Sequence, residues 1–342
     1  MVNIQLMSPP KNTSIFSPSR IVFYTLSLIV FYFGARYIGK WNNIRQLLLE
    51  MSTVWLLLAV AAQFSTYLFN MLMLRNLLMG ETGTAGLFTL FKLSVVIMFI
   101  NQALPTGGIS GNGYIFRQLV KRKVPPSRVF NALILESICY YMAFLTLLSV
   151  FYAWYMGHVP VVAPVIRYTV ITGFVFFIIL GIAVLLIADK RAVSFVLDKL
   201  SHFGFMKRYI AKAGLLPIQQ GHADSWKVLF ENKRPVILAV VLQVCILTCD
   251  LITILAIMQG FHIQLAVSRI MFGLLLTLVV GSLPVSPGSL IAYESAMTYF
   301  YTLLGVPVHA ALIITLLFRF FTFWLPIPIG LLLYRNLRRQ KA

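Results

Sequence analysis

The sequence predicts an all-α protein that crosses a membrane several times. Of its 342 residues, 60% are hydrophobic and only 11% are charged, whereas soluble domains carry about 25% charged residues. Six apolar runs reach the length of about 20 residues that a helix needs to cross hydrocarbon. Two further apolar runs are broken by clusters of Pro and Gly. We therefore expect a polytopic membrane protein with about six full spans and two re-entrant or broken helical hairpins, arranged as an inverted repeat.

The expected spans lie in one transmembrane domain over residues 21–334, between a cytoplasmic tail over 1–20 and a basic cytoplasmic tail over 335–342. Their ranges are 21–39, 53–74, 133–156, 165–188, 236–259 and 308–334. The first run follows a long polar lead, and no clean small-residue cleavage site comes after it. We therefore interpret it as a retained span instead of a cleaved signal peptide.

The two broken runs predict helical hairpins. The first stops at residues 105–113 and resumes over 114–121, and the second stops at 284–289 and resumes to 304. Pro and Gly end helices because Pro lacks an N–H group and Gly loosens the backbone. Charge also allows a full crossing and return at the first break, but the short, weakly apolar arm 114–121 favours a re-entrant hairpin.

The net charge of +19 predicts the orientation of the chain, because Lys and Arg collect on the cytoplasmic side of membrane proteins. With a cytoplasmic N-terminus and two returning hairpins, 22 of the 28 basic residues lie on the cytoplasmic face and five on the other. Loop 189–235 carries apolar residues at helical spacing among charges, which predicts an amphipathic helix on anionic lipid. We expect both termini in the cytoplasm and no nucleic-acid partner.

An inverted repeat is predicted by the order of these segments. Residues 53–156 and 236–334 each read as span, hairpin, span, and their hairpins enter from opposite sides. Two short sequence echoes support the repeat: Leu104-Pro105 against Leu283-Pro284, and Val124-Pro125 against Val306-Pro307. Inverted repeats with broken helices are typical of carriers that alternate access.

The hairpin tips are candidate binding sites for an anion. Backbone N–H groups of a glycine-rich turn and a helix N-terminus can bind phosphate, and an arginine adds a bidentate contact. The alternative is that the glycines only permit a tight bend. The candidate residues are Gly107, Gly108, Gly111, Gly113 and Arg117 in the first tip, and Ser286, Gly288 and Ser289 in the second.

Four charged residues fall inside apolar runs: Glu136, Asp250, Glu294 and Arg319. Charges within a membrane are costly, so each is a functional-site hypothesis. Arg319 is a candidate for binding lipid phosphate, and the three acids for balancing charge or taking up protons. A structural ion pair, for example Arg319 with Glu294, is an equally weighted alternative. No histidine accompanies Asp250 and its neighbouring cysteines, so we predict neither a metal site nor a cofactor.

Both tips resemble signatures of the lysylphosphatidylglycerol synthase transmembrane-region family, also called flippase-like membrane proteins. The motifs are Leu104-Pro105-Thr106-Gly107-Gly108…Arg117, and Leu283-Pro284-Val285-Ser286-Pro287-Gly288-Ser289-Leu290…Glu294, then Gly305-Val306, Ala310-Ala311, Arg319 and Gly330. The resemblance covers roughly residues 20–334. The family usually has a second glycine where this chain has Ser289, and another small residue where it has Ala292.

The resemblance implies lipid translocation in a bacterial inner membrane. Bifunctional relatives make an aminoacylated lipid with a soluble C-terminal domain. The sequence ends at Ala342, so we expect a stand-alone member that is not an enzyme. The expected cargo is an anionic or aminoacylated phospholipid or a polyprenyl-phosphate-type lipid. A membrane subunit of a lipid or glycolipid biosynthetic enzyme and a small-anion transporter are the alternatives, and a homo-oligomer is compatible with the sequence.

Overall fold

The computed structural model describes residues 51–79, 82–103, 109–188, 233–283 and 291–339. The chain divides into two compact units, Met1–Ser52 and Thr53–Ala342, and every helix described below belongs to the second. The expected tail 1–20, the first span 21–39 and nearly all of loop 189–235 lie outside the described residues.

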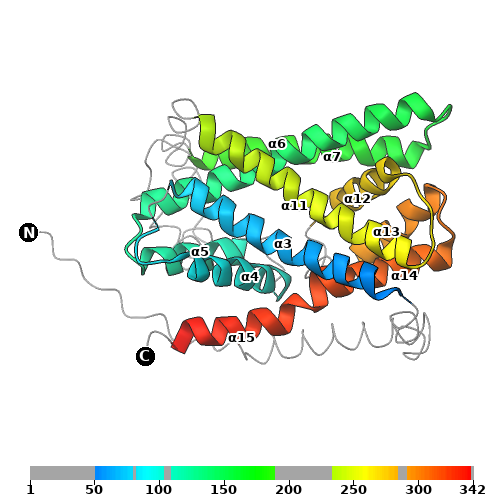
Figure 1. Ribbon diagram of the computed structural model, residues 1–342. Helices are drawn as coiled ribbons and strands as arrows, with labels where there is room; N and C mark the ends of the chain where they lie inside the picture. Colours follow the sequence, from blue (N-terminus) through cyan, green and yellow to red (C-terminus); the bar gives the residue numbers. More distant parts are fainter. Residues whose placement is uncertain (1–50, 80–81, 104–108, 189–232, 284–290, 340–342) are drawn as a thin grey trace, which may run out of the picture. The chain divides into compact units, whose positions relative to one another are not determined.

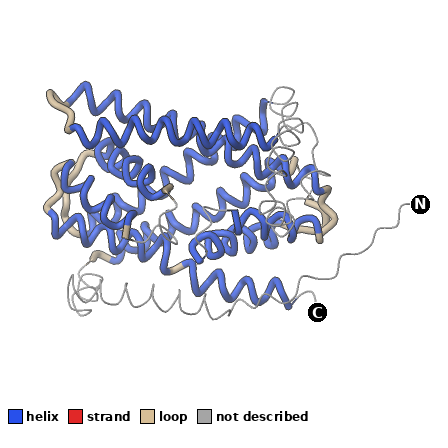
Figure 2. Tube along the Cα trace, turned by 180° about the vertical axis from the view of Figure 1, so that it is seen from behind, coloured by secondary structure: helices blue, strands red, loops and turns tan. Residues whose placement is uncertain are grey.

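Helices make up nearly all of the described residues, and no strand occurs among them (Figures 1 and 2). They are α3 (Thr53–Leu77), α4 (Leu87–Ala103), α5 (Ile109–Val120), α6 (Pro126–His158), α7 (Pro164–Ala188), α11 (Lys233–Gly260), α12 (Val267–Gly281), α13 (Ala292–Leu303), α14 (Val308–Arg319), η3 (Phe320–Trp324) and α15 (Pro326–Arg339).

Five segments are long and apolar enough to cross a membrane: Thr53–Leu77, Pro126–His158, Pro164–Leu186, Lys233–Gly260 and Val308–Leu337. They coincide with the five predicted spans that fall within the described residues, so the chain is a polytopic, all-helical membrane protein. The helices α4 and α12, of 17 and 15 residues, extend only about 25 and 22 Å. Both are shorter than the hydrocarbon core of about 30 Å.

The long helices α3 and α11 pack side by side in opposite directions (Figure 1). Near the end of α3, the Asn76 side chain donates a hydrogen bond to the carbonyl of Pro235, at the start of α11, over 2.7 Å. Thirteen residues earlier in α3, Gln63 bonds to Asp250, farther along α11. The two bonds pair later residues of α3 with earlier residues of α11, which shows that the helices are antiparallel.

The shorter helices form two antiparallel pairs, as predicted for the hairpins. In α4–α5, the backbone N–H of Thr84 donates to the carbonyl of Arg122 at the open end, over 3.0 Å. In α12–α13, the Tyr301 hydroxyl donates to the carbonyl of Ile270 over 2.9 Å. The two pairs open towards opposite ends of the helical unit (Figure 1).

Each pair is followed by the same backbone turn. Lys123 (φ 65°) and Gly305 (φ 109°) adopt left-handed conformations, and each precedes a buried valine and the proline that caps the next helix. The N–H groups of Val124 and Val306 both donate to the carbonyl five residues back, over 3.2 and 3.0 Å. The Val-Pro echo in the sequence therefore corresponds to a shared local structure.

Basic side chains gather where α3 and α15 end and where α6 and α11 begin. Figure 1 places these helix ends at one end of the helical unit, which we call the basic end. The residues at or next to these helix ends include Arg75, Lys121, Arg122, Lys123, Arg128, Lys233, Arg234 and Arg335. The opposite end of the described helices has Arg167, at the start of α7, and Arg269, at the start of α12.

Gly83 closes the open end of the first hairpin. Its φ is +59°, and an added Cβ would collide with the Arg122 carbonyl oxygen. We expect Gly83→Ala to lower the free energy of unfolding by about 1–3 kcal/mol, because the substitution adds both backbone strain and a steric clash. Thermal unfolding in detergent measures this. Gly86→Ala is the control, since a Cβ there meets open space, and equal losses in both variants would contradict the prediction.

Candidate functional site

Arg319 and Glu294 form an ion pair inside the helical unit. Arg319 is the last residue of α14, and Glu294 lies in the first turn of α13. The Arg319 Nε donates to Glu294 Oε1 over 2.7 Å, and the two side chains are 9% and 23% exposed. The pairing predicted as one alternative from the sequence is therefore formed.

Two aromatic rings hold the guanidinium group of Arg319. Its central carbon lies 4.6 Å from the ring centre of Tyr293 and 4.5 Å from that of Phe323. Both distances are within the range of cation–π attraction. Because Tyr293 belongs to α13 and Phe323 to the segment after α14, the rings fix the arginine between two elements.

The start of α13 places Tyr293 against the end of α12. Ile291 precedes the helix with φ 64° and ψ −57°, a conformation that a β-branched residue rarely adopts. A Cβ on Gly281 would lie 2.5 Å from Tyr293 Cδ2. Only glycine therefore lets α12 approach the tyrosine ring in its present position.

The helix that carries Arg319 changes character directly after it. Residues Phe320–Trp324 form a π-helical segment, η3, closed by a bond from the Leu325 N–H to the Phe320 carbonyl over 2.8 Å. Pro326 and Pro328 follow, and neither has an N–H to continue the regular α-helical pattern. Such segments are frequent at functional sites. The sequence analysis predicted one uninterrupted span here. Pro326 and Pro328 are the signal from which a local change in the helix could have been expected.

A second polar group surrounds Asp250 where α3 meets α11. The Gln63 Nε2 donates to Asp250 Oδ1 and lies equally close to Thr253 Oγ1, both at 2.9 Å. The phenol groups of Tyr67 and Tyr140 interact electrostatically with Asp250. This α11 carboxylate thus accepts a hydrogen bond from α3 and lies within electrostatic reach of a phenol from α6.

Tyr293 connects the two groups. Its ring contacts the Arg319 guanidinium at 4.6 Å, and its phenol is near enough to Asp250 and Tyr140 to interact with them electrostatically. We call the whole set the central polar cluster. Its members are Gln63, Tyr67, Tyr140, Asp250, Tyr293, Glu294 and Arg319, and they come from both halves of the chain.

The cluster combines a fixed cation with acidic oxygens that can bind a ligand or a proton. Glu294 Oε2 is buried and has no hydrogen-bond partner within the described ranges, so it can accept a hydrogen bond or a proton. Among the same residues, no three His, Cys, Asp or Glu side chains are grouped to hold a metal ion.

The other predicted site residues lie elsewhere. Gly111 is packed beneath Asn101, whose side chain accepts a hydrogen bond from its N–H over 3.1 Å. Gly113 and Arg117 are exposed on α5, and Arg117 lies in the last turn of that helix. Glu136 is half-buried on α6, one turn before Tyr140. The roles proposed for these residues stay predictions, as do those of Gly107, Gly108, Ser286, Gly288 and Ser289, which lie outside the described residues.

Sequence reasoning identified the charged members of the cluster and missed its neutral ones. Gln63, Tyr67, Tyr140 and Tyr293 are ordinary residues in apolar helices. The available signals were weak: Tyr293 is adjacent to Glu294, and Tyr140 follows Glu136 by one helical turn.

Comparison with known proteins gives one family match and one distant relative. The sequence model of the lysylphosphatidylglycerol synthase TM region matches residues 20–330. The UPF0104 membrane protein MJ1595 of Methanocaldococcus jannaschii is 23% identical over 265 residues, which cover 75% of this chain and 77% of the relative. No solved structure matches the chain.

Proposed function

Because the chain belongs to the lysylphosphatidylglycerol synthase transmembrane-region family, we propose that it translocates a lipid between the leaflets of a membrane. The cargo is an anionic or aminoacylated phospholipid or a polyprenyl-phosphate-type lipid. Its head group binds at the central polar cluster, and the protein acts as a carrier and not as an enzyme.

The observation that carries this proposal is the buried guanidinium of Arg319. Arginine keeps its charge in every environment and suits the geometry of phosphate. In a polytopic membrane protein such a charge is costly unless it is paired or serves a ligand path. The aromatic rings of Tyr293 and Phe323 orient it, which favours repeated binding and release of one kind of anion.

The charges of the cluster also favour coupling to protons. Arg319 contributes one positive charge, and Asp250 and Glu294 contribute two negative charges when both are ionised. A lipid phosphate would then meet a net negative cluster. A proton on either acid, or a cationic group on the lipid, removes this repulsion. We therefore assign these acids to charge balance during transport.

The two halves supply a mechanism for alternating access. In each half a long helix is followed by an antiparallel pair of short helices, the same turn and a further long helix. This order supports an inverted repeat with re-entrant hairpins that meet near the membrane centre. Rocking of one half against the other would expose the cluster to each side in turn.

Reconstitution in liposomes tests the function. Purified protein should accelerate leaflet exchange of at least one fluorescent anionic phospholipid or polyprenyl phosphate, compared with empty vesicles. Vesicles that instead take up a small anion without lipid exchange would favour the transporter alternative. Turnover of a lipid precursor into a new product would favour the enzyme alternative.

Asp250→Asn tests whether the carboxylate of Asp250, on α11, balances charge during transport. Asparagine keeps an oxygen that can accept the bond from Gln63, so we expect normal folding. Because the charge is removed, we expect the exchange rate to lose most of its dependence on pH. Thr248→Val on the same helix is the control, since that hydroxyl donates to the Val244 carbonyl of its own helix. A wild-type pH profile in Asp250→Asn would contradict the assignment.

A further inference from the structure

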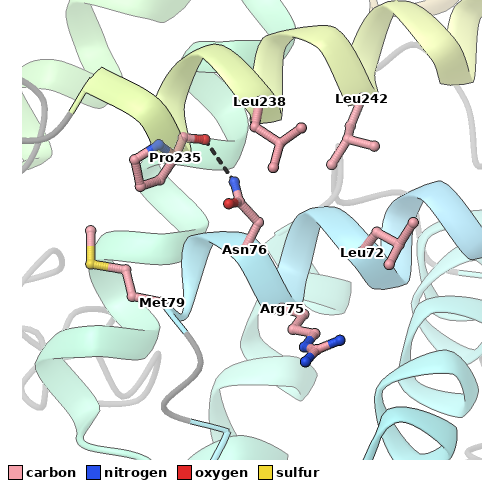
Figure 3. A pocket seen from close by; sticks show the side chains of 7 residues that line it. All are labelled: Leu72, Arg75, Asn76, Met79, Pro235, Leu238 and Leu242. Carbon is pink, nitrogen blue, oxygen red and sulfur yellow. Dashed lines mark hydrogen bonds between the residues drawn. The ribbon is translucent and has the colours of Figure 1, made fainter.

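A pocket of about 470 Å³ opens between the end of α3 and the start of α11. Figure 3 shows that Leu72 and Arg75 line it from α3, and Leu238 and Leu242 from α11. The hydrogen bond from Asn76 to Pro235 joins the two helices there. The pocket therefore lies at the basic end of the central helix pair, away from the central polar cluster.

The walls of this pocket have an apolar part and a cationic part. The side chains of Leu72 and Leu238, on two membrane-spanning helices, are 38% and 47% exposed. They are therefore accessible to an acyl chain. Arg75 is exposed in the last turn of α3, and Lys233 and Arg234 begin α11. Along each helix, the exposed leucine and the basic residues are thus separated by less than about two helical turns.

Within the described helices α3 and α11, no acidic residue lies near these cations. Asp250 is the only acidic residue in α3 or α11, and it follows Leu238 by twelve residues, or about 18 Å along the helix. An anion near Arg75 is therefore also near Lys233 and Arg234, the two basic residues that begin α11, at the edge of the hydrophobic region. This combination of charge and apolar surface matches a phospholipid at a membrane interface.

We propose that this pocket binds one anionic glycerophospholipid, with its phosphate at Arg75 and an acyl chain along Leu72, Leu238 and Leu242. The bound lipid contacts both α3 and α11 and stabilises the antiparallel pair. The site is separate from the transport site and does not depend on the proposed function.

Native mass spectrometry of the full chain in detergent tests the proposal. Dioleoyl-phosphatidylglycerol should form a one-to-one adduct more readily than dioleoyl-phosphatidylcholine, and soluble glycerol phosphate should not displace it. Arg75→Gln should weaken this binding about tenfold, as expected for loss of a charge-assisted contact. Arg167→Gln, which removes an exposed arginine at the opposite end, should leave it unchanged.

A second variant separates binding from folding. Leu238→Trp fills the pocket, so the adduct should disappear while the helical circular dichroism signal remains. Equal affinity of wild type and Arg75→Gln for phosphatidylglycerol would overturn the proposal, as would displacement by glycerol phosphate. A photocrosslink from position 238 to residues 189–232 of the same chain, without a lipid adduct, would also overturn it and assign the pocket to that segment.

Discussion

Arg319→Ala is expected to abolish lipid exchange in liposomes and to destabilise the protein. The variant leaves Glu294 without its partner at 2.7 Å, and removal of one member of a buried ion pair costs about 3–5 kcal/mol. The guanidinium that we assign to the lipid phosphate is lost as well. Leaflet exchange normalised to folded protein, together with thermal unfolding in detergent, measures both effects.

A double variant distinguishes a functional pair from a structural one. Replacing both Arg319 and Glu294 by methionine removes both charges, and apolar replacement of a whole buried pair is often neutral for stability. We expect this protein to unfold near the wild-type temperature and to remain inactive. If it exchanged lipid at the wild-type rate, the pair would be structural only.

Arg319→Lys tests the shape of the cation. Lysine keeps the charge but lacks the planar fork that binds carboxylate and phosphate with two bonds. Its tetrahedral ammonium group also cannot stack on the rings of Tyr293 and Phe323 as a planar guanidinium can. We expect intermediate stability and a rate at least tenfold below wild type. Wild-type rates for this variant would show that charge alone is sufficient.

Much of the fold could be predicted because membrane-spanning helices have a strong one-dimensional signal. A run of about 20 apolar residues has few alternatives in a bilayer, and this identified the five spans within the described residues. Pro and Gly clusters likewise identified where α4 and α12 end. Helix ends were less predictable: α6 begins at Pro126, seven residues before the expected run, because polar residues near its start continue the helix.

Of the central polar cluster, the sequence predicted only those residues whose type is unusual in an apolar helix. Arg319, Glu294 and Asp250 are conspicuous because charges are rare in apolar runs. Gln63 is not. Its place opposite Asp250, 187 residues later in the sequence, depends on the register of two helices. No local pattern encodes that register, which arises from the packing of α3 against α11. The same reason explains why Tyr293, on the preceding helix α13, was missed as a partner of Arg319.

Gly281→Ala is expected to reduce lipid exchange through the position of Tyr293. The added Cβ would lie 2.5 Å from the tyrosine ring, so the ring must leave the position in which it contacts the Arg319 guanidinium, or α12 must shift. Overpacking of this kind costs about 1–3 kcal/mol, and we expect exchange per folded protein to fall roughly tenfold. The loss of the cation–π contact, not the loss of stability alone, is the expected cause.

Gly273→Ala provides the matched comparison in the same hairpin. A Cβ there would lie 3.0 Å from atoms of Tyr301 and Leu304. Tyr301 lies about two helical turns beyond Glu294 on α13, and its hydroxyl bonds to the Ile270 carbonyl. Both alanine variants should therefore lower the unfolding temperature. Only Gly281→Ala should lower exchange per folded protein, because only it displaces the ring that orients Arg319. Equal activity losses in the two variants would mean that the hairpin acts through overall stability and that Tyr293 has no specific part in holding the cation.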